Sequence, residues 1–171
     1  MANITDIIAG LFPGISVDTP EKSAPVVTVD DSKWHEVAAA LRDTKGLQMD
    51  YLVTIVGMDW PEGLGCMYYL MSSVTNEIVG VKVLAIGDRE QPSITSVADI
   101  WKVATLYERE VYDFFGIVFV GNPDMRRLFL SIDWKGYPLR KDYDANPDLN
   151  PVSIESERQS DFTSTYSRNA D

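Results

Sequence analysis

The side chains best suited to chemistry lie between Leu106 and Tyr143, where carboxylates, arginines and aromatic residues are crowded together. Glu108 and Glu110 come closest to an acid and base pair. On a helix, however, residues two positions apart point about 160° away from each other, so these two carboxylates cannot act on one substrate. Desolvated charges need partners, and the crowding therefore indicates either an internal network of ion pairs or a subunit interface.

Other catalytic and metal-binding side chains are scarce. His35 is the only histidine and Cys66 the only cysteine, whereas a zinc site or an iron–sulfur cluster needs about four such ligands. The sequence also lacks a Ser/His/Asp arrangement, a phosphate loop and a dinucleotide fingerprint. We therefore expect no metal, no cofactor and no independent catalysis in this chain. Cys66 is expected to be a buried inert thiol, and His35 an ordinary partly buried or surface residue.

The charge of the chain is unevenly distributed. Its net charge is −11, but five cations and three carboxylates between Gly121 and Tyr143 make this stretch +2, which leaves −13 for the remainder. Binding to nucleic acid is not expected, because phosphate backbones require clustered Lys and Arg throughout a surface. One alternative function is a free-standing module that binds an anionic ligand at this basic stretch.

The N-terminal stretch has no basic region and contains Asp6, so it resembles neither a signal peptide nor a transit peptide. The apolar runs are only several residues long, far below the roughly 20 residues that span a bilayer. We therefore expect a soluble chain of the cytoplasmic type, whose association with a membrane is indirect.

The elements that must position the charged cluster can be read from periodicity and turn residues. We expect a short helix over 3–12, a strand over 25–29 and a helix that begins near Asp31 and stops at Gly46. Three strand-like runs joined by short connections then predict a β-meander, over 51–59, 66–74 and 78–86.

A longer amphipathic helix is predicted over 96–115, with Gly116 as its C-terminal stop and a further strand over 117–119. Together these elements predict an α+β fold, in which an antiparallel or mixed sheet packs with two main helices. This domain is expected to cover residues 1–120.

Residues 121–171 are expected to form an extended C-terminal tail. They contain four prolines and no sustained period, yet their first half is too apolar for a solvated linker. The proximal tail should therefore wrap over this domain or dock on a partner. The last stretch, 153–171, is polar, and we expect it to be disordered in isolation.

One residue of the predicted helix is misplaced. The helical wheel puts Arg109, Glu110 and Asp113 on the polar side but Glu108 on the apolar face. A buried carboxylate without a partner would cost several kcal/mol, so we expect an arginine of the tail to reach it, or another subunit to face it. The candidate donors are Arg126, Arg127 and Arg140.

Three ordered blocks in this region resemble a known family. They read EREVYDFFGI over 108–117, NPDMRRL over 122–128 and DWKGYPLRKD over 133–142. These blocks are similar to the C subunit, also called the 30 kDa subunit, of respiratory complex I, the proton-pumping NADH–quinone oxidoreductase. Where this chain has Asn122 the family usually has histidine, so the position keeps a hydrogen-bonding turn residue but loses a titratable group.

The resemblance implies a peripheral structural subunit of the hydrophilic arm, on the cytoplasmic face of the cell inner membrane, in contact with subunits D and B. FMN, the iron–sulfur clusters and quinone would belong to partner subunits. The alternative within this class is the homologous subunit of an energy-converting hydrogenase or of a dehydrogenase fed by ferredoxin or a deazaflavin. The resemblance assigns interface and tail-anchoring roles to Glu108, Arg109, Glu110, Asp113, Arg126, Arg127, Asp133, Trp134, Arg140 and Lys141.

Overall fold

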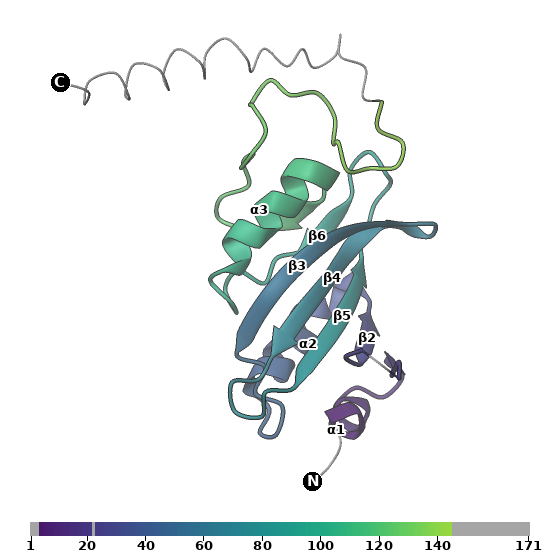
Figure 1. The fold of residues 1–171 in the computed structure, drawn as a ribbon, viewed down its shortest axis with the longest axis vertical. Helices are drawn as coiled ribbons and strands as arrows, with labels where there is room; N and C mark the ends of the chain where they lie inside the picture. Colours follow the sequence, from purple (N-terminus) through teal and green to yellow (C-terminus); the bar gives the residue numbers. More distant parts are fainter. Residues whose placement is uncertain (1–3, 22, 145–171) are drawn as a thin grey trace, which may run out of the picture.

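The computed structural model describes residues 4–21 and 23–144, and the expectations for 145–171 lie outside the described residues. Within these ranges the chain forms three helices and seven strands (Figure 1). In order they are α1 (Ile4–Leu11), β1 (Ser16–Asp18), β2 (Val26–Val29), α2 (Asp31–Asp43), β3 (Tyr51–Trp60), β4 (Gly63–Met71), β5 (Ile78–Leu84), β6 (Ser93–Thr95), α3 (Ala104–Phe115) and β7 (Val118–Val120).

The main sheet is mixed and has the strand order β1-β2-β5-β4-β3. Strands β3, β4 and β5 pair antiparallel through short connections, which confirms the predicted meander. Strand β2 adds to β5 in parallel, and β1 pairs antiparallel with β2 at the edge. The α+β class with a mixed sheet is therefore confirmed. The parallel pairing of β2 with β5 and the short strand β1 were not predicted.

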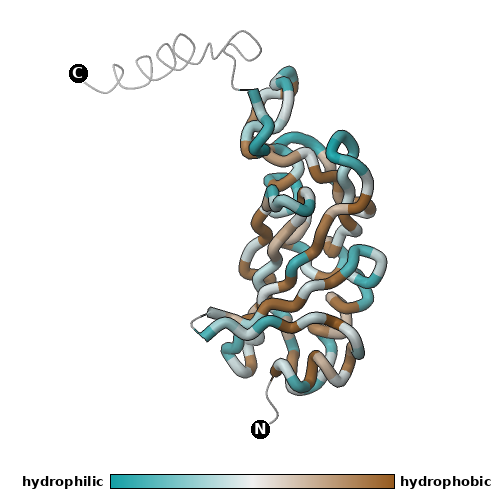
Figure 2. Tube along the Cα trace, turned by 90° about the vertical axis from the view of Figure 1, so that its right-hand side faces the viewer, coloured by the Kyte–Doolittle hydropathy of each residue, from teal (hydrophilic) through white to brown (hydrophobic). Residues whose placement is uncertain are grey.

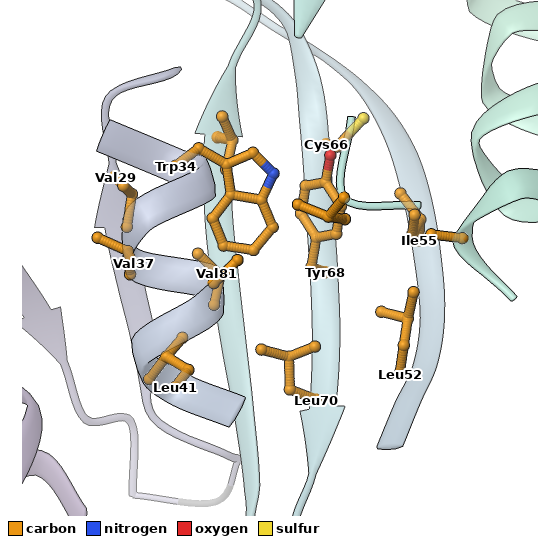
Figure 3. Packing of buried hydrophobic residues seen from close by; sticks show 14 of the residues in the cluster. Val29, Trp34, Val37, Leu41, Leu52, Ile55, Cys66, Tyr68, Leu70 and Val81 are labelled. Carbon is orange, nitrogen blue, oxygen red and sulfur yellow. The ribbon is translucent and has the colours of Figure 1, made fainter. Parts of the chain in front are cut away.

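The core lies between this sheet and helix α2. Trp34 and Leu41 of α2 point toward Tyr68, Leu70 and neighbouring strand residues (Figure 3), and the rings of Trp34 and Tyr68 lie 4.4 Å apart between centroids. All of these side chains are buried. Hydrophobic and hydrophilic residues alternate along the trace, with hydrophilic stretches at many of the connecting loops (Figure 2). One face of the sheet therefore carries the core.

A second, two-stranded sheet pairs β6 and β7 in parallel, and helix α3 connects them as in a βαβ unit. Strand β6, which was not predicted from the sequence, follows the loop after β5. Gly116 has φ 72° and its N–H donates to the carbonyl of Tyr112 at 2.8 Å, so the predicted helix stop is confirmed.

The predicted start of this last helix at Ser96 is wrong, because α3 begins only at Ala104. Residues 96–103 form turns instead, in which the N–H groups of Ile100 and Trp101 both donate to the carbonyl of Val97. The hydroxyl of Ser96 accepts the N–H of Ala98 and donates to the carboxylate of Glu108, so it connects these turns to α3. The helix-like spacing of the apolar residues in 96–103 arises because most of their side chains are buried from turns.

Residues 121–144, which we call the C-terminal strap, leave β7 and pass over the end of α3 (Figure 1). Within the described ranges, no helix is long and apolar enough to cross a membrane.

Candidate functional site

Asp113 is the centre of the contact between α3 and the C-terminal strap. Its side chain is 0% exposed, and its Oδ2 accepts three successive backbone N–H groups, those of Leu128, Phe129 and Leu130, at 2.6–3.0 Å. Its Oδ1 accepts a hydrogen bond from the guanidinium of Arg127 at 2.9 Å. One carboxylate therefore fixes the course of the strap over three residues.

The ionised form of Asp113 is maintained by these donors. Burial disfavours the charge, but the N–H groups of Leu130 and Phe129 together with Arg127 outweigh it and lower the pKa of Asp113 below its ordinary value. Three amides that converge on one oxygen form an anion-binding arrangement of the kind that phosphates occupy elsewhere. Here a side chain of the same chain fills it.

Two arginines extend this contact by binding backbone carbonyls. Arg109 of α3 donates to the carbonyls of Arg126 and Arg127 at 3.0 and 3.1 Å and pairs with Asp124 at 3.1 Å. Arg127 donates to the carbonyls of Trp134 and Gly136 within the strap. The planar guanidinium, with its five donors, suits this bridging of several acceptors.

The sequence-based placement of Arg109 and Asp113 on the polar side of the helix is wrong, since both residues are buried. The helical wheel identified the side that the main domain leaves open, and the C-terminal strap covers that side. Glu110 is exposed, as its position on the wheel predicted.

Glu108 is buried as predicted, with 0% exposure, but none of the arginines in the described part of the chain reaches it. Its carboxylate accepts hydrogen bonds from the Ser96 hydroxyl at 2.7 Å, the Val97 N–H at 2.9 Å and the Asn122 side-chain amide at 2.7 Å. The expected pairing with an arginine of the tail is therefore wrong, because neutral donors from the ends of β6 and β7 occupy the site instead.

The electrostatics of Glu108 differ from those of Asp113. Burial raises the pKa of the Glu108 carboxyl, and its three hydrogen bonds oppose this only in part. Asp99 adds a further negative charge, and its carboxylate lies 2.9 Å from the exposed imidazole of His35, to which it is hydrogen-bonded. Burial likewise raises the pKa of the Cys66 thiol, which agrees with an inert cysteine.

A second ion network, which no sequence pattern indicated, holds the far end of the C-terminal strap. Arg89, in the loop after β5, binds both oxygens of Asp59 at 2.5 and 3.0 Å and both oxygens of Asp142 at 2.6 and 2.9 Å. The N–H of Lys141 also donates to Asp59 at 2.9 Å. Arg89 lowers the pKa of Asp142 to about 2. No local motif could predict this network, because Arg89 lies 30 or more positions from both carboxylates in the chain.

Arg140 closes the strap over the end of α3. It donates to the carbonyl of Phe115 at 2.6 Å and to that of Arg89 at 2.8 Å, and its guanidinium lies 4.6 Å from the ring centroid of Tyr137. That ring lies against Gly116, where any Cβ would overlap with it. Glycine at this position therefore serves both the left-handed turn and the close approach of Tyr137.

The other predicted residues lie on the outer side of the strap. Arg126 is exposed and pairs with Asp124, Asp133 is exposed, and Trp134 is half-buried. Large apolar side chains lie on the same surface, with exposed fractions of 65% for Phe129 and 96% for Ile132. The ring of Phe129 stacks on Phe114 of α3 at 5.8 Å. The outer side of the strap thus combines large apolar side chains with a few exposed charges.

This arrangement is suited to binding and positioning, since the buried carboxylates of Glu108 and Asp113 each accept several hydrogen bonds, whereas Arg140 keeps one buried nitrogen, Nη2, without a partner among the described residues. Within residues 4–21 and 23–144, no group of three or more His, Cys, Asp and Glu side chains could hold a metal ion. Fold and site together define a class of α+β domain whose last helix is locked to a C-terminal strap by buried carboxylates and arginines.

Comparison with known families identifies this class. Residues 27–148 match the family described as the 30 kDa subunit of respiratory-chain NADH dehydrogenase, and the chain belongs to that family. Among curated relatives, the C/D subunit of the NADH-quinone oxidoreductase of Bacteroides thetaiotaomicron is 49% identical over 80% of this chain, and the chain spans 27% of that relative's length. The C subunit of the same enzyme from Chlorobium phaeobacteroides is 38% identical over 74% of this chain and 76% of its own.

Two solved structures share the fold. A trypsin-resistant fragment (1–134) of Nqo5 is 27% identical, with a TM-score of 0.60, over 71% of this chain and 96% of that one. A chain of the membrane-bound sulfane sulfur reductase, an archaeal respiratory membrane complex, is 24% identical, with a TM-score of 0.74, over 91% of this chain and 92% of that one. The latter likeness concerns the fold alone.

Proposed function

We propose that this chain is a non-redox structural subunit of a membrane-associated, proton-pumping NADH–quinone oxidoreductase. In this role it helps to assemble the hydrophilic arm that passes electrons from NADH through FMN and iron–sulfur clusters to quinone. Membership of the 30 kDa subunit family and the names of the relatives support the assignment. The observation that carries a structural role is the C-terminal strap, whose buried ionic groups bind one another while Phe129 and Ile132 face outward.

The proposed partners are subunits D and B of the same arm. Relatives that are named as C/D subunits carry both names on one longer chain, which supports proximity to the D subunit. We place the docking element in residues 121–171, of which the structure describes 121–144, and assign the domain itself to 1–120. On this proposal Asp113, Arg109, Arg127 and Arg140 hold the strap in shape, and the outer residues contact the partner.

Cofactors and location follow from the same proposal. FMN, the iron–sulfur clusters and quinone would be bound by partner subunits, and catalysis would require the whole complex. The chain would be peripheral, held at the cytoplasmic face of the cell inner membrane through its partners.

A second candidate is the homologous subunit of an energy-converting hydrogenase or of a dehydrogenase fed by ferredoxin or a deazaflavin. The observation that favours it is the occurrence of the same fold in an archaeal respiratory membrane complex of another kind. The two candidates differ in the electron-input subunits that accompany the chain.

Affinity purification of the full-length tagged chain from native membranes, followed by mass spectrometry and absorption spectroscopy, tests the proposal. We expect recovery with subunits D and B, with flavin and with iron–sulfur absorption. Recovery with a nickel-binding large subunit would instead establish the second candidate. Consistent recovery of the chain as a lone monomer, from membranes and from cytosol, would contradict both.

A further inference from the structure

The main sheet has a second face that the core does not use. The register of β3, β4 and β5 places Tyr51, Met71 and Ile78 in one row, and Thr54 with Tyr69 and Val56 with Met67 in the rows beside it. Side chains alternate between the faces of a sheet, so these residues point away from Leu52, Ile55, Tyr68 and Leu70 of the core. We call Tyr51, Val56, Met67, Tyr69, Met71 and Ile78 the open face.

The described helices leave the open face uncovered. Helix α2 packs on the opposite side of the sheet, and in Figure 1 no described helix crosses in front of β4 and β5. Phe115 of α3 lies against Gly57, which has the parity of Ile55 and therefore belongs to the core side. None of the six open-face side chains belongs to the buried core cluster or to the half-buried residues packed against it.

The chemistry of the open face differs from that of the rest of the chain. Among the paired positions of β2 to β5 that share this face, Lys82 is the only charged residue, and its ammonium pairs with Glu62 at 2.5 Å. In a chain of net charge −11, this face is electrically neutral. Tyr and Met, which supply four of its six residues, are enriched at protein interfaces, where charged groups are depleted.

The area and the charge of the open face indicate whether a second copy of this chain or a different protein chain binds there. The three strands that carry these residues are spaced about 4.8 Å apart, and the six side chains extend over about 20 Å of their length, which gives an area of roughly 300 Å². A standard interface buries about 800 Å² per partner, and two copies of a strongly acidic chain repel each other. A second copy is therefore disfavoured. The neutral open face is complementary to a neutral surface on a different chain. Because the open face is small, that chain must also contact this one at other places.

We propose that the open face binds an uncharged, apolar surface of a different protein chain within the assembly that this chain joins, so the inference rests on the proposed function. This contact is additional to the one proposed for the C-terminal strap. Asp59, which binds Arg89 and the N–H of Lys141, points to the same side of β3 as the core residue Ile55. The strap and the open face therefore lie on opposite sides of β3.

Site-specific photo-crosslinking in the native assembly tests this proposal. The full-length chain carries p-benzoylphenylalanine at Tyr69, or as a matched control at Val74, which is exposed in the loop between β4 and β5. We expect Tyr69 to crosslink, at least about tenfold more than Val74, to an apolar stretch of one co-purifying chain. Crosslinks to a second copy of this chain, or yields equal to those of the control, would overturn the proposal.

A charge placed on the same face supplies an independent measurement. Val56→Glu should lower recovery of that partner chain about tenfold, because the interface would bury an unpaired carboxylate, while Val74→Glu leaves recovery unchanged. Thermal melting of the purified variants verifies that both are folded. Normal recovery with folded Val56→Glu would overturn the proposal. Co-purification of other subunits through the strap tests the proposed function separately, so the two failures are distinguishable.

Discussion

Glu108 is a buried carboxylate whose hydrogen-bond donors, among residues 4–21 and 23–144, are all neutral. Its three hydrogen bonds join α3 to the turn after β6, through Ser96 and Val97, and to the end of β7, through Asn122. A charged partner would have fixed the ionisation of the group, whereas here burial raises its pKa. The residue therefore acts as a junction between three elements, at an electrostatic cost that its hydrogen bonds offset in part.

Replacing this junction should be strongly destabilising. Glu108→Ala leaves the buried Ser96 hydroxyl and Val97 N–H without this acceptor and removes one of the two acceptors of the half-buried Asn122 amide. We therefore expect the free energy of unfolding to fall by roughly 3–5 kcal/mol. Chemical denaturation of the purified chain measures this change. Glu110→Ala, which removes an exposed carboxylate of the same helix, is the control and should change stability by less than about 0.5 kcal/mol.

The same substitution distinguishes a structural from a redox role. On the proposed function, Glu108→Ala should weaken assembly of the complex without altering the intrinsic redox potential of any cluster. Normal assembly combined with lost electron transfer would show that the structural assignment of Glu108 is mistaken.

Asn122 adds no titration of its own to the junction, because an amide does not titrate. Asn122→His should introduce a step, since an imidazolium beside Glu108 would have its pKa raised above the ordinary value of about 6.5. The added stability is then fully present below about pH 6.5 and is lost as pH rises through the raised value. Melting temperatures compared between about pH 5.5 and pH 8.5 should differ by about 2–4 °C more than in the parent chain. An unchanged difference would contradict this expectation.

At the scale of elements, α3 and the C-terminal strap form one unit. The helix supplies Asp113 and Arg109, and the strap supplies three amides, two carbonyls and Arg127, so each completes the hydrogen bonding of the other. Gly116 and Gly57 allow Tyr137 and Phe115 to approach closely at the end of the helix. The strap is therefore a preformed surface, and its contact with a partner requires less ordering than a flexible tail would.

Removal of the central carboxylate should release the strap. In Asp113→Ala the three amides of 128–130 and Arg127 lose their acceptor, and we expect trypsin to cleave at Arg126, Arg127 or Lys135 at least about tenfold faster. Cleavage timed by mass spectrometry on the purified chain provides the measurement. Glu110→Ala is again the matched control, and equal rates for Asp113→Ala and the parent chain would contradict the inferred role.

The elements differ in how far their sequence reveals them. The meander is predictable because local turns mark it, between Trp60 and Gly63 and between Met71 and Ile78. The parallel pairs β2 with β5 and β6 with β7 join segments distant in the chain, and short strands carry little periodicity of their own. The buried side of α3 is misread from sequence because a helical wheel cannot show a covering segment that lacks a period. Asn122 and Ser96 were not predicted as partners of Glu108, because both lie outside the helix in segments without a regular period.

At the scale of the whole molecule, the strap is fastened at both ends, by Asp113 near its start and by the Arg89 network near its end. The second fastening joins the strap to β3 and to the loop after β5. It therefore couples the strap to the main sheet as well as to α3.

Acid should weaken this second fastening in a defined range. Arg89 lowers the pKa of Asp142 from its ordinary value of 3.8 to about 2, so the stabilisation is present above 3.8 and is lost as pH falls toward 2. Asp142→Asn should therefore melt below the parent chain at about pH 6, and the difference should vanish near pH 2. Calorimetry over this range measures it. A difference that persists unchanged at the acid end would exclude Asp142 as its source.

The binding of Asp113 by amides of residues 128–130 also has a consequence for synthesis of the chain. The ribosome completes α3 before it makes these amides, so the nascent helix carries a carboxylate and an arginine whose donors and acceptors do not yet exist. Both side chains lie on the side of α3 that the main domain leaves open, so they stay hydrated until the next fifteen or so residues are made and the strap covers them. A chain interrupted in that interval would present an unfinished helix to chaperones and proteases.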